Sequence, residues 1–171
     1  MTPSHVDSGQ HSDRKSNSRI IIEAVAPELD GGRYPVKRVV DDLFEVSADI
    51  FRDGHEVLCA ELRHRFVGDE DWSAAPMLPH ENDRWIGACR LQRNGRHLYT
   101  IVAWTDVFAS WRHDFERKRK AGQDLKLDLI EGRELLERAV SVATDEDRVQ
   151  LRRLVGLIGP TTDVETQATT L

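Results

Sequence analysis

Seven histidines and two acidic clusters are the residues of this chain that could do chemistry by their type. The histidines form no HxH or HExxH pattern and have no carboxylates at ligand spacing, so the sequence predicts no metal site. A glycosidase needs two carboxyl groups held across a cleft, roughly 5–10 Å apart. The acidic clusters at 69–71 and 145–147 fall instead in a polar loop and in the first turn of a predicted helix. Solubility and helix capping explain these positions.

The two cysteines, Cys59 and Cys89, lie inside strand patterns without CxxC spacing. They are predicted to be buried thiols, neither a disulfide nor a nucleophile. A glycine-rich phosphate loop is also missing from the sequence. The sequence therefore predicts no catalytic residue, no cofactor and no metal ligand.

The aromatic residues give the candidate contact sites. Trp72 and Trp85 lie on neighbouring strand candidates, where they could stack together on sugar rings or fill the core. A core position is favoured for Trp85, whereas the two interpretations are evenly balanced for Trp72. Both residues are kept as candidate glucan contacts. Trp104 and Trp111 flank a change from strand to helix and are predicted to pack the helix on the sheet.

A helical spacing of i, i+3 and i+7 places Phe108, Trp111 and Phe115 on one face of the predicted helix. Such a stripe must be covered by the strands, by other helices or by a partner. These three residues are therefore candidates for an interface or for helix packing.

Six segments of strand-like pattern precede three of helical pattern. The strands are predicted at 19–25, 43–51, 56–66, 72–78, 84–91 and 97–104, with Asp53-Gly54 and Asn94-Gly95 as turns. The helices are predicted from 106 to about 122, over 125–142 and from 144 to Gly159-Pro160. This pattern predicts a β-sandwich followed by an α-helical segment. The polar ends, residues 1–18 and 161–171, are predicted to be disordered tails.

Composition limits the class of partner. The net charge is −6 with acidic and basic residues interleaved, so the chain lacks the basic stripe of a nucleic-acid binder. The densest basic run, Arg117–Lys120, is interpreted as a solvated helix face. No apolar run approaches the roughly 20 residues that span a bilayer, and the N-terminus has no apolar signal segment. A cytoplasmic protein without membrane or nucleic-acid partners is expected.

Several blocks of the sequence resemble, in order, the start of the bacterial maltosyltransferases that extend α-1,4-glucan from maltose 1-phosphate. The blocks are EAVAPELDGGRYPVKRVV (23–40), FRDGHEVLCAELRHR (51–65), NDRW (82–85), GRHLYTIVAWTD (95–106) and WRHDFERKRKAGQD (111–124).

The resemblance implies an immunoglobulin-like β-sandwich over 19–106 and a helical segment, an incomplete helical bundle, over 107–160. In that family the two build much of a homodimer interface beside a catalytic barrel of the α-amylase (glycoside hydrolase 13) superfamily, with an aspartate nucleophile and a glutamate acid/base. The barrel takes roughly 250 residues, and none of its motifs occurs here. The chain is therefore expected to be inactive alone and to be a fragment.

The implied partners are the catalytic barrel, a second copy in a homodimer, and α-1,4-glucan. In the family the chain also returns from the bundle to add a final strand, so an unpaired sheet edge is expected here. The alternative functions are a free-standing glucan-binding module and a dimerisation module.

Overall fold

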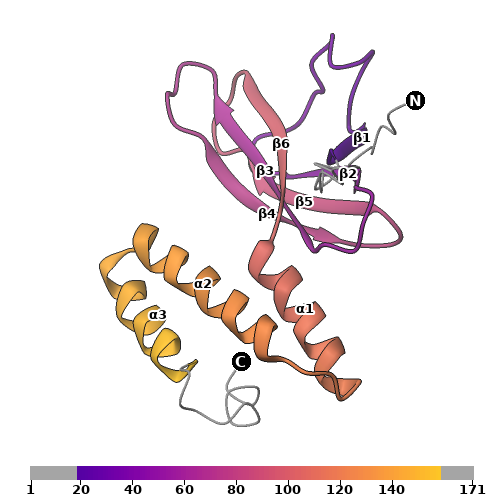
Figure 1. The fold of residues 1–171 in the computed structure, drawn as a ribbon. Helices are drawn as coiled ribbons and strands as arrows, with labels where there is room; N and C mark the ends of the chain where they lie inside the picture. Colours follow the sequence, from indigo (N-terminus) through magenta and orange to yellow (C-terminus); the bar gives the residue numbers. More distant parts are fainter. Residues whose placement is uncertain (1–18, 159–171) are drawn as a thin grey trace, which may run out of the picture.

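The computed structural model describes residues 19–158, which form six strands and then three helices (Figure 1). The prediction of a β-rich part followed by helices is confirmed. The predicted tails at 1–18 and 161–171, and the stop at Gly159-Pro160, lie outside the described residues. The strands are β1 (Ile21–Ala26), β2 (Leu43–Phe51), β3 (Leu58–Phe66), β4 (Ser73–Pro79), β5 (Arg84–Arg90) and β6 (His97–Thr105), and the helices are α1 (Val107–Lys120), α2 (Lys126–Val142) and α3 (Asp145–Leu157).

The six strands form one antiparallel sheet in the order β1-β2-β5-β4-β3-β6. The sheet folds back on itself, because β2 and β6 are four places apart in this order and yet share one core. The Phe44 ring of β2 meets the Tyr99 ring of β6 edge to face, with centroids 5.2 Å apart. The two layers of this sandwich-like fold are thus the two ends of one sheet. The immunoglobulin-like topology stays a prediction.

Strand β4 forms the corner at which the sheet folds. Met77 pairs with Ala60 of β3 on one side and with Gly87 of β5 on the other. A Cβ atom on Gly87 would lie 2.7 Å from Met77 Cγ and 3.3 Å from Leu62 Cβ. Because Gly87 carries no side chain, β3 and β5 can approach one another across this corner.

The helices have a core of their own, separate from that of the strands. Trp111 is buried there, and its indole N–H donates to the Asp128 carbonyl oxygen of α2 at 2.8 Å. The expectation that Trp111 packs α1 on the sheet is wrong, because the indole inserts between α1 and α2. The buried members of this core are Trp111, Phe115, Leu125, Leu129, Leu136 and Ile158.

A polar junction fixes the start of α1 against β3. Asp106 caps the helix by accepting the Ala109 N–H at 2.8 Å, and its own N–H donates to the Val57 carbonyl oxygen at 2.8 Å. The Ser110 hydroxyl accepts the Val57 N–H at 2.8 Å and donates to the Asp106 carbonyl oxygen at 2.6 Å. Four hydrogen bonds therefore join the end of β6, the start of α1 and the residue before β3.

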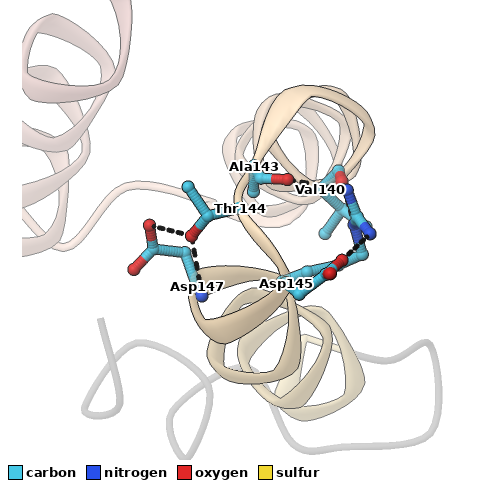
Figure 2. A network of polar contacts seen from close by, with 6 residues as sticks. Val140, Ala143, Thr144, Asp145 and Asp147 are labelled. Atoms are coloured by element: carbon cyan, nitrogen blue, oxygen red, sulfur yellow. Dashed lines mark hydrogen bonds and ion pairs between the residues drawn. The ribbon is translucent and has the colours of Figure 1, made fainter.

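The corner between α2 and α3 is also closed by polar contacts (Figure 2). Thr144 caps α3 by accepting the Asp147 N–H at 3.3 Å, and its hydroxyl donates to the Asp147 carboxylate at 2.8 Å. The Arg148 side chain satisfies the end of α2 and the start of α3 together. It donates to the Val140 carbonyl at 3.3 Å, the Ala143 carbonyl at 2.7 Å and the Asp145 carboxylate at 2.6 Å.

Candidate functional sites: an edge groove and an exposed tryptophan

A groove of about 800 Å³ opens between the segment that follows β1 and strand β6. Strands β1 and β6 are the two edges of the sheet in the part of the chain that the structure describes. The groove lining mixes polar and apolar residues; the apolar ones include Val25, Phe44, Leu91 and Ile101, which we call its apolar floor. An edge strand exposes one row of unpaired backbone N–H and C=O groups. The groove therefore combines an apolar floor with a strand edge that has no partner strand within residues 19–158.

Tyr99 of β6 is one of the residues that line the groove. Its hydroxyl donates to the Pro27 carbonyl oxygen at 2.6 Å, which ties β6 to the segment after β1. Burial raises the pKa of the Tyr99 hydroxyl, the Glu28 carboxylate raises it further, and the Arg38 guanidinium acts in the opposite direction. The phenol therefore stays protonated at neutral pH and acts as a hydrogen-bond donor.

Two histidines line the end of the groove that β3 and β6 form. Burial lowers the pKa of His64, and the neighbouring His97 lowers it further, so the His64 ring is neutral at pH 7. His97 Nε2 lies 2.9 Å from the Arg93 carbonyl oxygen, whereas His97 Nδ1 is buried without a hydrogen-bond partner among the described residues.

The charges around the groove are mainly positive. Four arginines and one carboxylate line it, in a chain whose net charge is −6. Arg33 pairs with Asp30 and Arg93 with Asp69, so part of this positive charge is balanced. Arg38 lies over the Phe44 ring, with the guanidinium carbon 5.5 Å from the ring centroid. The charges favour an occupant with acidic or neutral side chains. The charged lining residues are Glu28, Arg33, Arg38, Arg93 and Arg96.

Two stacked arginines stiffen the loops at the same end of the sheet. Arg93 lies over the Phe66 ring at 3.8 Å from its centroid and contacts both carboxylate oxygens of Asp69 at 2.9 Å. Arg65 lies over the Trp72 ring at 4.8 Å from its centroid. Asp69 of the first acidic cluster is thus part of an ion pair that joins two loops.

The structure does not bring Trp72 and Trp85 together into one sugar platform. Trp72 precedes β4, whereas Trp85 pairs with Pro79 at the far end of β4, so about 20 Å of strand separates them. Trp72 is 40% exposed. Trp85 is half-buried, packs against the strand core and donates its indole N–H to the Ile50 carbonyl oxygen at 3.2 Å. A contact of either residue with glucan stays a prediction.

The aromatic stripe of α1 is covered mainly by the other helices. Trp111 and Phe115 are 6% and 1% exposed and stack with centroids 5.3 Å apart. Phe108 is 36% exposed and lies against Trp111 at the same centroid distance. Helix packing thus accounts for the two inner residues, and an interface role for the stripe remains a prediction.

The described residues offer little that could carry out covalent chemistry. Burial raises the pKa of the Cys89 thiol; burial and then the Asp106 carboxylate raise that of Cys59, so both thiols are poor nucleophiles at neutral pH. Residues 19–158 hold no group of three or more side chains placed to bind a metal ion. Within the same range, no helix is long and apolar enough to cross a bilayer.

Comparison with known proteins identifies the family. The family model described as alpha-1,4-glucan:maltose-1-phosphate maltosyltransferase, domain N/S, matches residues 18–171. The chain belongs to this family. Curated relatives of domain N/S include the maltosyltransferase of Chlorobaculum tepidum, which is 44% identical over 140 residues (82% of this chain and 21% of the relative). That of Myxococcus xanthus is 45% identical over 141 residues, 80% of this chain and 21% of the relative.

This domain N/S chain therefore spans about a fifth of the length of the curated relatives it matches. The groove residues Arg38, Arg96 and His97 did not emerge as candidates from the sequence. They come together through pairing between distant strands, for which no local pattern exists. The Gly31-Gly32 and Asn94-Gly95 turns that flank the groove were the available signals.

Proposed function

We propose that this chain is the N-terminal, non-catalytic part of a cytoplasmic maltosyltransferase. That enzyme would transfer maltosyl units from α-maltose 1-phosphate to α-1,4-glucan. The observation that carries the proposal is the domain N/S match over 18–171, in a chain that spans a fifth of its relatives. In this role the chain supports the catalytic barrel and contributes to a homodimer interface.

The edge groove supports the same proposal. A strand that returns from elsewhere in a longer polypeptide would pair with the free edge of β6 and cover the apolar floor. Pairing would satisfy the exposed backbone groups of β6 and remove an aggregation-prone edge. We propose that the groove receives such a strand, with acidic or neutral side chains facing Arg38 and Arg96.

A chimera tests the function. The segment of the Myxococcus xanthus maltosyltransferase that matches this chain is replaced by residues 19–158, and phosphate release from maltose 1-phosphate is measured with glycogen as acceptor. We expect release by the chimera and none by the 171-residue chain or by the relative without the segment. Release by the 171-residue chain alone would contradict a non-catalytic role, and an inactive chimera would contradict the assignment.

A second candidate is contact with α-1,4-glucan at Trp72. The supporting observation is that the Trp72 indole is 40% exposed, with the Arg65 guanidinium lying over one face of its ring. Aromatic faces pack against the C–H faces of sugar rings. We expect retention of the chain in an amylose-containing native gel, lost in Trp72→Ala and kept in the control Trp104→Ala, which removes an indole that is 43% exposed elsewhere. Equal migration in gels with and without amylose would eliminate this candidate.

A further inference from the structure

The outer face of the sheet carries an unusual apolar row across three strands. Trp104 of β6 pairs with Cys59 of β3, and Leu78 of β4 continues the register one residue beyond the Ala60–Met77 pair. The buried side chains of these strands point inward, so Trp104, Cys59 and Leu78 share the opposite face. With neighbouring strands about 4.8 Å apart, the row from Trp104 to Leu78 is about 10 Å wide.

The next row extends this apolar surface and balances its charge. Val102 of β6 and Pro76 of β4 flank Glu61 of β3 in the same register. Glu61 forms an ion pair with Arg63 on the same face. The charges at the centre therefore cancel. We name Cys59, Pro76, Leu78, Val102 and Trp104 the outer patch.

The outer patch is open to solvent in this chain. Leu78 is 66% exposed and Trp104 is 43% exposed with α1, α2 and α3 in place. The solvated face of an antiparallel sheet is ordinarily polar. A contiguous apolar patch on such a face marks an interaction surface. The described helices therefore do not supply its cover.

The chemistry of the outer patch fits an apolar protein surface better than a sugar. Glu61 is already paired with Arg63, and the thiol of Cys59 donates to the Asp106 carboxylate at 3.8 Å. Few polar groups remain to accept hydrogen bonds from sugar hydroxyls. The centres of protein interfaces are enriched in tryptophan and depleted of charge, as here.

We propose that the outer patch is the surface on which the catalytic part of the maltosyltransferase docks. This inference rests on the proposed function. Its occupant is a folded part of the longer polypeptide, since about four fifths of each relative lies outside the matched segment. It is a different surface from the edge groove, because it lies on the outer faces of β3, β4 and β6, whereas the groove opens between the segment that follows β1 and strand β6.

Two variants in two proteins test the docking surface. Leu78→Asp places a charge in the outer patch, and Leu127→Asp places one on α2 at a position that is 80% exposed. Both are made in the active chimera and in the 171-residue chain. We expect Leu78→Asp to lower the Tm of the chimera by at least about 3 °C and to leave that of the 171-residue chain within about 1 °C. Leu127→Asp should leave both unchanged.

The outcomes separate this inference from the proposed function. A chimera that releases no phosphate before any further substitution overturns the proposed function and the inference with it. If the chimera is active and Leu78→Asp does not change its Tm, the inference alone is overturned. The 171-residue chain is also followed by sedimentation. If it self-associates and Leu78→Asp makes it monomeric, the outer patch binds a second copy, and docking of the catalytic part is overturned. A Tm that falls equally in both proteins would also overturn it, because Leu78 would then act within the domain.

Discussion

Gly132 of α2 lies directly against the indole ring of Trp111 in α1. A Cβ atom at position 132 would lie only 2.6 Å from Trp111 Cε2 and Cη2. The indole is held in place by its hydrogen bond to the Asp128 carbonyl oxygen, one turn earlier on α2. The close contact between α1 and α2 therefore depends on a helical residue without a side chain.

The first prediction concerns this contact. Alanine has a higher helix propensity than glycine by about 1 kcal/mol, yet we expect Gly132→Ala to lower the free energy of unfolding by about 1–3 kcal/mol because the indole must move. The control Gly156→Ala, on α3 with no atom within 4 Å of the new Cβ, should stabilise by up to about 1 kcal/mol. Urea unfolding measures both. Stabilisation by Gly132→Ala would show that the indole moves aside freely.

The ion pair between Lys118 and Asp128 is the second test. Lys118 Nζ and Asp128 Oδ1 lie 2.5 Å apart, and the Asp128 side chain is only 8% exposed. Replacing Asp128 by asparagine removes a charge-assisted hydrogen bond and should cost about 1–3 kcal/mol of unfolding free energy. Asp114→Asn, which breaks an exposed pair with Arg117, should cost at most about 0.5 kcal/mol.

The same pair predicts a pH dependence. The hydrogen bond to Asp128 raises the pKa of Lys118 above its ordinary 10.5. A raised pKa stabilises the folded state fully at pH values below the pKa of the unfolded chain. This stabilisation is lost as the pH rises through the pKa of the folded chain. The difference in stability between the unmodified chain and Asp128→Asn should therefore be constant from neutral pH to about pH 10 and shrink above 10.5. A difference that grows with pH would contradict the pair.

Arg148 gives a fourth prediction, at the corner between α2 and α3. Its guanidinium satisfies two carbonyl oxygens at the end of α2 and the Asp145 carboxylate. We expect Arg148→Met to reduce the free energy of unfolding by about 1–2 kcal/mol. Arg152→Met, one turn later at an exposed position of α3, should change it by less than about 0.5 kcal/mol. Equal effects of the two variants would mean that the corner does not depend on Arg148.

His64 gives a prediction in the range of mild acid. Burial and the nearby His97 lower the pKa of His64 below its ordinary 6.5. The folded state therefore binds a proton at His64 less readily than the unfolded state, and stability is lost as pH falls below about 6.5. Urea unfolding at pH 7 and pH 5 should show a smaller loss for His64→Gln than for the unmodified chain. His80→Gln, at an exposed position before β5, should show the full loss.

Local patterns were sufficient to locate the elements. Alternation at period two predicts β2, and its residues Phe44, Val46, Ala48 and Ile50 are all buried. Turn signals at Asp53-Gly54 and Asn94-Gly95 separate strands as expected. The acidic first turn after Thr144 begins α3 with the predicted cap. These features depend on neighbours within a few residues.

The candidate sites were harder to predict because they depend on contacts between distant residues. Pairing of β3 with β6, rather than with β4 alone, brings His64 of β3 beside the β6 residues that line the edge groove. Trp72 and Trp85 were expected on neighbouring strands, where they could meet, but they lie beside opposite ends of β4. Trp111 was expected on the sheet and is instead covered by α2. Register and helix packing are set by the whole fold, and a sequence window does not contain them.

The polar junction at Asp106 has a mechanical consequence. Helix α1 leaves the sheet directly from β6, and the hydrogen bonds of Asp106, Val57 and Ser110 restrict its direction. The 14 residues of α1 make a lever arm of about 21 Å. A rotation of about 5° at the junction would therefore displace Lys120, and the α2 helix that follows it, by about 2 Å. The direction of the whole helical segment relative to the sheet thus depends on a few hydrogen-bonded atoms at the junction of β6 and α1.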